Sequence, residues 1–222
     1  MKKLPLFCLS ALFVFATVAH SQQDSSARVP IEVDRVNWNA VRDGNRGSWQ
    51  EVEIQLSVNG YTESQQEALE LHTPLFLNDI EVILHTAHEL RSPQGSAIRD
   101  AQDNPVFVFY SSEVEIVSLE RNARNNQVLF YLPPEIVKRD GIRAGQEPFR
   151  FLIELRADGR EIPFSRESQR RMSSQLMDAE AVSNFMSQVR SQASANEGIL
   201  MPIYQTPHWH SRRAENSPPY KW

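Results

Sequence analysis

The sequence predicts a mainly β protein, with an antiparallel β-sandwich over residues 29–164 and an amphipathic helix plus an extended tail over residues 165–222. Apolar and polar side chains alternate in several short runs within the first range, which is the period of strands with one buried face. Turn-forming pairs such as Asn59-Gly60 separate these runs. From residue 168 onward the apolar spacing changes to three and four, the period of a helix.

The first three strands are predicted over residues 31–38, 51–58 and 80–84. The second strand has the clearest pattern, because four aliphatic side chains alternate with polar ones: Val52, Ile54, Leu56 and Val58. Residues 62–72 are rich in glutamine and glutamate and fit either a short helix or an extended edge, so both alternatives remain open.

Apolar runs and turn residues predict the middle of the sandwich. Residues 106–110 are apolar throughout, which indicates a central strand buried on both faces. Residues 114–116 and 128–132 are predicted to form a hairpin, since Asn125-Asn126 tolerates positive φ in the intervening turn.

The last part of the sandwich combines a crossover and a hairpin. Residues 134–139 suit one helical turn between the two sheets, because proline favours the start of a helix. Residues 149–155 alternate as a strand, and Asp158-Gly159 offers a tight turn into residues 161–164.

Residues 168–195 are predicted to form one helix with an apolar stripe, and four later prolines predict an extended tail. Large apolar side chains on the stripe and aromatic side chains in the tail need cover, because soluble proteins rarely leave them in water. They either pack on the protein's own sandwich or bind a partner. The candidate partner-binding residues are Met172, Leu176, Met186, Val189, Trp209, Tyr220 and Trp222.

Residues 1–21 have the pattern of a cleavable signal peptide. Two lysines precede an apolar run over residues 4–18, and Ala19-His20-Ser21 suits cleavage by a signal peptidase. The run is shorter than the roughly 20 residues that a membrane-spanning helix needs. We therefore expect a periplasmic, cell-surface or secreted protein with no stable membrane span after cleavage.

Composition excludes several classes of function. Cys8 is the only cysteine, so cleavage would remove any basis for a disulfide, a thiolate metal site or a cysteine nucleophile. Loss of Lys2 and Lys3 would change the formal net charge from −5 to −7, which argues against a nucleic-acid partner. The remaining length of about 200 residues fits one hydrophobic core.

Two close histidine pairs are the first candidates for a metal site. His208 and His210 would point to the same side of an extended tail, whereas His85 and His88 would point to opposite faces of a strand. No His-Glu-x-x-His motif accompanies either pair. We therefore expect packing or surface roles for these histidines, with no metal ion and no cofactor.

The remaining polar groupings predict no catalytic residues. Glu51/Glu53 and Glu113/Glu115 have the spacing to aim two carboxylates at one substrate, but the same spacing describes the solvated face of a strand. No Gly-x-Ser-x-Gly motif and no phosphate-binding loop occurs. The solvated face is the interpretation that we favour for both acid pairs.

Several features together resemble known families. About seven short strands, hairpins, a Pro-Pro crossover and no disulfide resemble an immunoglobulin-like sandwich of the exported, cysteine-free kind. The leader, Val-Asn-Trp at residues 36–38, Ser-Trp-Gln-Glu-Val-Glu-Ile at residues 48–54 and Phe-Leu-Asn-Asp-Ile at residues 76–80 look like the Akkermansia-type pilus-like secreted proteins. The similarity would cover residues 29–164. It implies a non-enzymatic role associated with type IV pilus machinery.

The expected function is that of an exported, non-catalytic binding or assembly protein of the cell envelope. Its partner would be an envelope or pilus-assembly protein. The alternative is a carbohydrate-binding module or glycan-active protein, which would use exposed aromatic rings and a pair of acids to hold a sugar.

Overall fold

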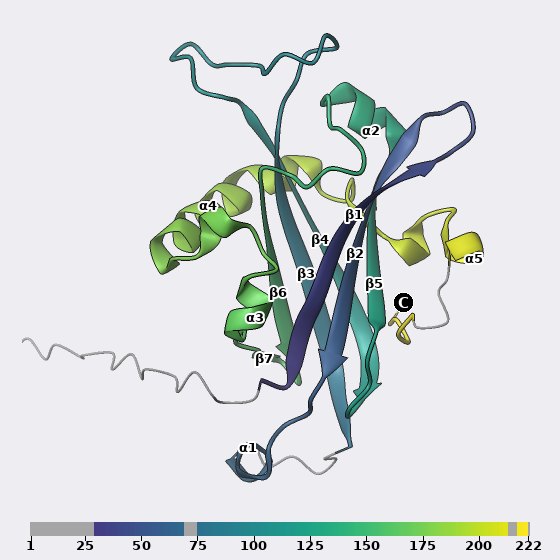
Figure 1. Cartoon of the computed structure of the whole chain (residues 1–222), viewed down its shortest axis with the longest axis vertical. Helices are drawn as coiled ribbons and strands as arrows, with labels where there is room; N and C mark the ends of the chain where they lie inside the picture. Colours follow the sequence, from purple (N-terminus) through teal and green to yellow (C-terminus); the bar gives the residue numbers. More distant parts are fainter. Residues whose placement is uncertain (1–28, 69–74, 213–216, 222) are drawn as a thin grey trace, which may run out of the picture.

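The structure is a computed structural model that describes residues 29–68, 75–212 and 217–221. Two four-stranded antiparallel sheets face each other (Figure 1). The first sheet has the order β1-β2-β5-β8 and the second has the order β4-β3-β6-β7. The mainly β, sandwich-like architecture that the sequence predicts is therefore confirmed.

The strands of the first sheet are β1 (Ile31–Arg42), β2 (Ser48–Val58), β5 (Asn126–Leu132) and β8 (Met201–Pro202). Those of the second are β3 (Phe76–Glu89), β4 (Phe107–Glu120), β6 (Arg150–Ala157) and β7 (Arg160–Glu161). The α-helices are α1 (Glu63–Ala68), α2 (Pro134–Arg139), α3 (Arg166–Gln169), α4 (Ala179–Gln192) and α5 (Trp209–Arg212). Short 3-10 helices are η1 (Ser174–Leu176), η2 (Ala193–Asn196) and η3 (Ile203–Gln205).

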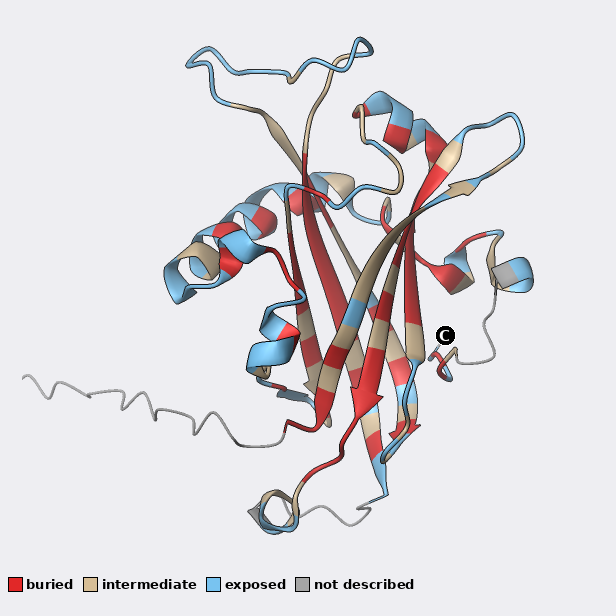
Figure 2. Cartoon of the chain, viewed as in Figure 1, coloured by how far each residue is buried: buried red, intermediate tan, exposed pale blue. Residues whose placement is uncertain are grey.

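The core lies between the two sheets, where alternate side chains of each strand meet. Ile54 of β2, Leu84 of β3, Phe130 of β5 and Ile153 of β6 have no exposed surface. Figure 2 shows the buried residues concentrated along the strands. The period-two pattern in the sequence identified these inward faces correctly.

Two predicted connections are confirmed. Asp158 and Gly159 have φ of 51° and 70°, and they join β6 to β7 with Ala157 paired to Arg160. Positive φ at both turn positions is the geometry of a type I′ hairpin. The predicted helical turn is α2, which connects β5 in the first sheet with β6 in the second.

Two predictions about β4 are wrong. β4 pairs with β3 in the second sheet while β5 pairs with β2 in the first, so residues 114–116 and 128–132 do not form a hairpin. β4 also ends its sheet rather than lying at the centre. Its apolar run faces two different neighbours, because Tyr110 lies in the core while the ring of Phe109 lies 6.1 Å from that of Phe185 on α4.

The single helix predicted over residues 168–195 is divided into α3, η1, α4 and η2. Two serine hydroxyls of this segment, that of Ser168 within α3 and that of Ser173 just before η1, bond to strands of the sandwich. Ser168 Oγ accepts a hydrogen bond from Val33 N of β1 at 2.9 Å, and Ser173 Oγ accepts one from Phe151 N of β6 at 2.8 Å. Asp178 then caps α4 by accepting from Ala181 N at 2.7 Å. The Asp178 cap is a local side-chain bond of the kind that competes with a continuous helix, whereas the two serine bonds tie the segment to distant strands.

The prediction of an extended tail is wrong for the segment that forms η3 and α5, although residues 217–221 are extended. Pro219 O accepts from Val117 N at 2.9 Å, and Lys221 N donates to Glu115 O at 2.8 Å. This last stretch therefore lies along β4 like a short added strand. β8 pairs with β5 nearby, so the C-terminal segment covers the sandwich on the β4/β5 side as well as on the β1/β6 side (Figure 1).

Two predictions concern the signal peptide and membrane spanning. The signal peptide over residues 1–21 lies outside the described residues. Within the part of the chain that the structure describes, no helix has both the length and the apolar character needed to cross a bilayer.

Candidate functional site

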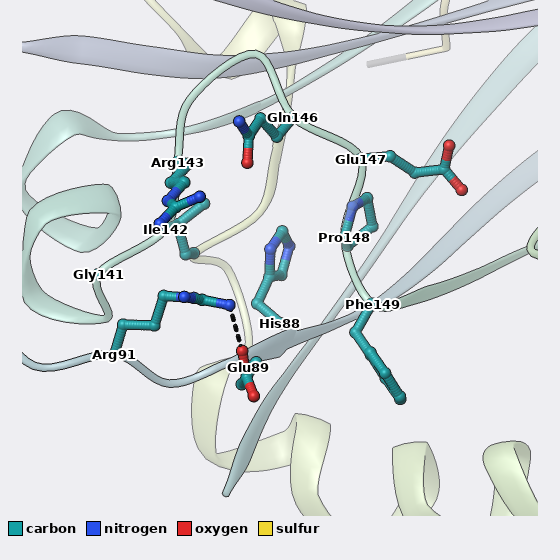
Figure 3. A pocket seen from close by; sticks show the side chains of 10 residues that line it. All are labelled: His88, Glu89, Arg91, Gly141, Ile142, Arg143, Gln146, Glu147, Pro148 and Phe149. Atoms are coloured by element: carbon teal, nitrogen blue, oxygen red, sulfur yellow. Dashed lines mark hydrogen bonds and ion pairs between the residues drawn. The ribbon is translucent and has the colours of Figure 1, made fainter. Parts of the chain in front are cut away.

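A pocket of about 190 Å³ opens at the end of the sandwich where the β3–β4 loop and the α2–β6 loop meet. We call it the end pocket. Two chain segments line it, residues 88–91 and residues 141–149 (Figure 3). Its lining residues are His88, Glu89, Arg91, Gly141, Ile142, Arg143, Gln146, Glu147, Pro148 and Phe149.

His88, near the end of β3, forms the inner wall of the end pocket. Its side chain is 5% exposed and its ring makes an edge contact with Tyr110 at 5.9 Å. Burial lowers the pKa of His88 to about 4, so the imidazole is neutral at neutral pH. Its Nε2 atom is buried and has no hydrogen-bond partner in the protein. A buried polar atom in that state is rare and costly.

A hydrogen-bonded network behind His88 fixes the end of α2. Tyr110 Oη donates to Asp140 Oδ2, and Arg139 contacts the same carboxylate through Nε at 2.8 Å and Nη2 at 2.9 Å. Burial is the main reason that the pKa of Tyr110 is raised. The network therefore joins β4 to the residue from which the pocket loop departs.

The loop after α2 is held closely against its neighbours. Arg91 N donates to Asp140 O at 3.1 Å, and Gly141 follows with φ of 64°. A Cβ atom at position 141 would lie only 2.5 Å from Arg91 O. Farther along, the fully buried Gln50 of β2 accepts from Gly145 N at 2.7 Å. These contacts give the pocket a fixed outer wall.

Some charged side chains around the end pocket form an ion pair with a described residue, and others do not. Arg91 Nη2 forms an ion pair with Glu89 Oε2. Arg143 is exposed and has no ion pair with any residue that the structure describes. Burial raises the pKa of Glu147, whose carboxylate points away from His88 in Figure 3. The charge that remains to be matched near His88 is therefore the Arg143 guanidinium.

A second pocket, of about 230 Å³, is lined by Glu113, Glu115, Tyr204 and Lys221. Lys221 Nζ lies 3.1 Å from Glu115 Oε2. Burial raises the pKa of Glu113, and the nearby carboxylates of Glu81 and Glu115 add to the effect. We call this the side pocket. Glu113 is exposed and Glu115 is half-buried, so this acid pair lies on a solvated face of β4 as predicted, and that face is hollowed into a pocket.

Aromatic rings from the tail lie beside the side pocket. The ring of Tyr220 is 5.5 Å from that of Tyr204 and 5.9 Å from that of Trp209. Of these rings only Tyr204 lines the side pocket, and Tyr220, which packs on it, is buried. The side pocket therefore presents two acids, a lysine and one aromatic ring.

A chain of side chains across the second sheet resembles a hydrolase triad in composition. Ser111 Oγ lies 2.9 Å from His85 Nδ1, and His85 Nε2 lies 3.0 Å from Glu154 Oε1. The bond to His85 is the main reason that the pKa of Glu154 is lowered. A nucleophile also needs donors for the developing oxyanion and room for a substrate, and Ser111 lines neither pocket. We interpret these three hydrogen-bonded side chains as a structural link between β4, β3 and β6.

The two acids of the other predicted pair, Glu51 and Glu53, differ in burial. Glu51 is only 1% exposed, and it accepts hydrogen bonds from Tyr131 Oη at 2.6 Å and Asn39 Nδ2 at 3.0 Å. The solvated-face interpretation is therefore wrong for Glu51. The sequence could not show this, because residues far along the chain provide the cover.

The candidate partner-binding residues lie against the protein's own core. Met172, Leu176, Val189 and Tyr220 are buried there, while Met186 and Trp209 are half-buried and pack against it. Trp222 lies outside the described residues. Of the two alternatives for the stripe and the tail, intramolecular packing is the arrangement observed in this structure.

The histidine pairs do not converge. His85 bonds to Ser111 while His88 packs on Tyr110, so the two side chains face opposite sides of β3 as predicted. His208 packs between rings of the first sheet, 5.0 Å from Trp49 and 4.9 Å from Tyr131. Across the described ranges, no three His, Cys, Asp or Glu side chains gather closely enough to hold a metal ion.

The end pocket was not predicted from the sequence, because its residues belong to no known motif. A cue was present in the glycines and the Pro-Phe pair that follow α2, which mark a constrained loop. Comparison with known proteins adds no assignment: no family model, no curated protein and no solved structure matches this chain.

Proposed function

We propose that this protein is an exported, non-catalytic binding protein of the cell envelope, and that the sandwich end bearing the end pocket is its recognition surface. One observation carries the proposal: two segments far apart in the sequence, residues 88–91 and residues 141–149, converge there on a concave, partly charged site. Loops held by a rigid scaffold are the usual place for binding residues.

The C-terminal segment supports this choice of surface. It covers the β1/β6 side through Ser168 and Ser173, and it covers β4 through residues 217–221. Covered sheet edges do not readily accept a partner strand. The pocket end is less fully covered: Phe149, at the rim of the end pocket, is 43% exposed and stacks on Phe107 with ring centroids 4.7 Å apart.

The strand order supports an immunoglobulin-like assignment for the sandwich. The order β1-β2-β5 faces β4-β3-β6-β7, which corresponds to strands A-B-E against C′-C-F-G of that fold. In such sandwiches the loops cluster at the two ends and often carry recognition. Together with the predicted signal peptide and the resemblance to pilus-like secreted proteins, this order favours a protein of the envelope or of type IV pilus machinery as partner.

A site-specific crosslinker tests the proposal. A photoreactive residue placed at Phe149 should capture one dominant envelope protein in cells. The matched control replaces Arg160, an exposed residue in the β6–β7 hairpin at the opposite end, and should capture little. Equal capture from both positions, or enzymatic turnover by the purified protein, would contradict the proposal.

The side pocket favours a second candidate, carbohydrate binding. Its acids and the ring of Tyr204, on which the buried Tyr220 packs, are the observation behind this alternative. A glycan array decides between the two candidates. Binding that is lost in Glu113→Gln and kept in Glu120→Gln, an exposed acid on the same strand, would favour the sugar site. A blank array would remove it.

A further inference from the structure

We infer that the end pocket binds a small organic carboxylate, with the Arg143 guanidinium as its counter-charge and His88 Nε2 as a hydrogen-bond partner. The inference rests on the proposed role of this end of the sandwich as a recognition surface. It specifies the class of ligand that the pocket takes.

One ring nitrogen of His88 lacks a hydrogen-bond partner among the described residues. Nε2 is buried without a hydrogen bond from the protein, although the surrounding polar groups form a dense network. Figure 3 shows the imidazole standing between Ile142 and Pro148, below Gln146. Leaving a buried polar atom unsatisfied is unfavourable. Nε2 has almost no exposed surface, so a ligand oxygen must displace the atoms that cover it, and it would then remove this cost by accepting a hydrogen bond from Nε2–H.

One positive charge at the end pocket is not matched by an ion pair with a described residue. Glu89 already neutralises Arg91, and the carboxylate of Glu147 is directed away from His88 (Figure 3). Arg143 is left as the cation without an ion-pair partner among the described residues. A guanidinium presents paired N–H donors that match the two oxygens of a carboxylate. The neutral imidazole adds a directional donor without adding charge.

The pocket is small. Its volume of about 190 Å³ is below the roughly 300–1,000 Å³ of sites that take drug-sized ligands. The walls beyond the polar groups are Ile142, Pro148 and Phe149, so a short hydrocarbon chain fits behind the carboxylate. A large or highly charged ligand fits poorly.

The pocket is also held open before any ligand arrives. Gly141 is pressed against Arg91, and Gln50 anchors the loop at Gly145. A wall fixed in advance reduces the ordering cost of binding. This matters for a small ligand, whose few contacts supply little binding energy.

Titration of the purified protein with butyrate, followed through the NMR signals of the histidine ring nitrogens, tests the inference. The His88 signals, assigned from their loss in His88→Gln, should shift and saturate with a dissociation constant of about 1 mM, since so small a ligand binds weakly. Butyramide, which has nearly the same shape without the charge, should bind about tenfold more weakly.

Two arginine variants make the test specific. Arg143→Gln should weaken butyrate binding about tenfold. Arg124→Gln removes an exposed arginine from the β4–β5 turn and should leave the affinity unchanged. Both positions are exposed, so neither variant should affect folding.

The inference is overturned if butyramide binds as well as butyrate, if Arg143→Gln has no effect, or if the His88 signals do not shift at all. These outcomes are distinct from failure of the proposed function. Capture of an envelope protein at Phe149 without any response to butyrate would contradict the carboxylate site and still support the recognition surface. Saturable butyrate binding with no capture at Phe149 would support the carboxylate site and contradict the recognition surface.

Discussion

Ser168 in α3 accepts a hydrogen bond from the backbone N–H of Val33 in β1 at 2.9 Å, across 135 positions of sequence. Ser173 forms the same kind of bond to Phe151 of β6. One short segment therefore satisfies backbone donors on strands from both sheets. The segment after β7 is thus part of the folding unit rather than an appendage to it.

Ser168→Ala should destabilise the protein by about 1–3 kcal/mol, because Val33 N would lose its partner in a buried position. Urea denaturation measures this loss. The control is Ser187→Ala on the exposed side of α4, which should change stability by no more than about 0.5 kcal/mol. Equal stability of the two variants would show that the hydrogen bond to Val33 does not contribute measurably to the stability of the fold.

Phe185→Ala should be more harmful, with a loss of about 3–5 kcal/mol. The ring of Phe185 has no exposed surface and covers the outward-facing Phe109. Met177→Ala, at a side chain that is 55% exposed, is the matched control and should be nearly neutral. Thermal unfolding of the two variants compares them directly. A small loss of stability in Phe185→Ala would mean that α4 is only weakly held on the sandwich. Binding of a partner protein by the apolar stripe of residues 168–195 would then again be the favoured alternative.

The inward faces of single strands could be predicted from sequence because their signal is local. Ile54 and Leu56 alternate with polar neighbours and are fully buried. The position of β4 could not be predicted in this way. Its run is apolar on both faces because α4, which begins more than fifty residues later, covers Phe109. A sequence window cannot distinguish such cover from a position at the centre of a sheet.

The end pocket was beyond prediction for a related reason. His88, Arg143 and Phe149 come from the end of a strand and from a loop that reaches it only after the chain has crossed between sheets. The prediction that His85 and His88 face opposite sides was correct. It was not enough to show that one of them would line a cavity, because the other wall comes from a distant segment.

Stability should depend on pH through His88. Its pKa is about 4 in the folded protein against an ordinary 6.5, so the unfolded chain binds more protons between these values. The stabilisation is therefore fully present above about pH 6.5 and falls as the pH is lowered toward 4, by up to roughly 3 kcal/mol. Denaturation at several pH values measures this slope.

The matching variants for the pH series are His88→Gln and His210→Gln, the latter at an exposed position on α5. His88→Gln should flatten the dependence between pH 6.5 and 4 even if it lowers stability overall. His210→Gln should retain it. If both variants keep the slope of the unmodified protein, His88 is not the group responsible.

Gly141→Ala should destabilise the protein more than Gly159→Ala, and the difference isolates the close approach that shapes the end pocket. Both glycines have similar positive φ, 64° and 70°, so each substitution carries a backbone cost of about 1–2 kcal/mol. Only at position 141 would the new Cβ meet a backbone atom, 2.5 Å from Arg91 O, whereas position 159 is open. To relieve that contact the loop bearing Arg143 must shift. Urea denaturation should therefore show a larger loss for Gly141→Ala, and equal losses would mean that the loop yields freely and that the pocket wall is not fixed.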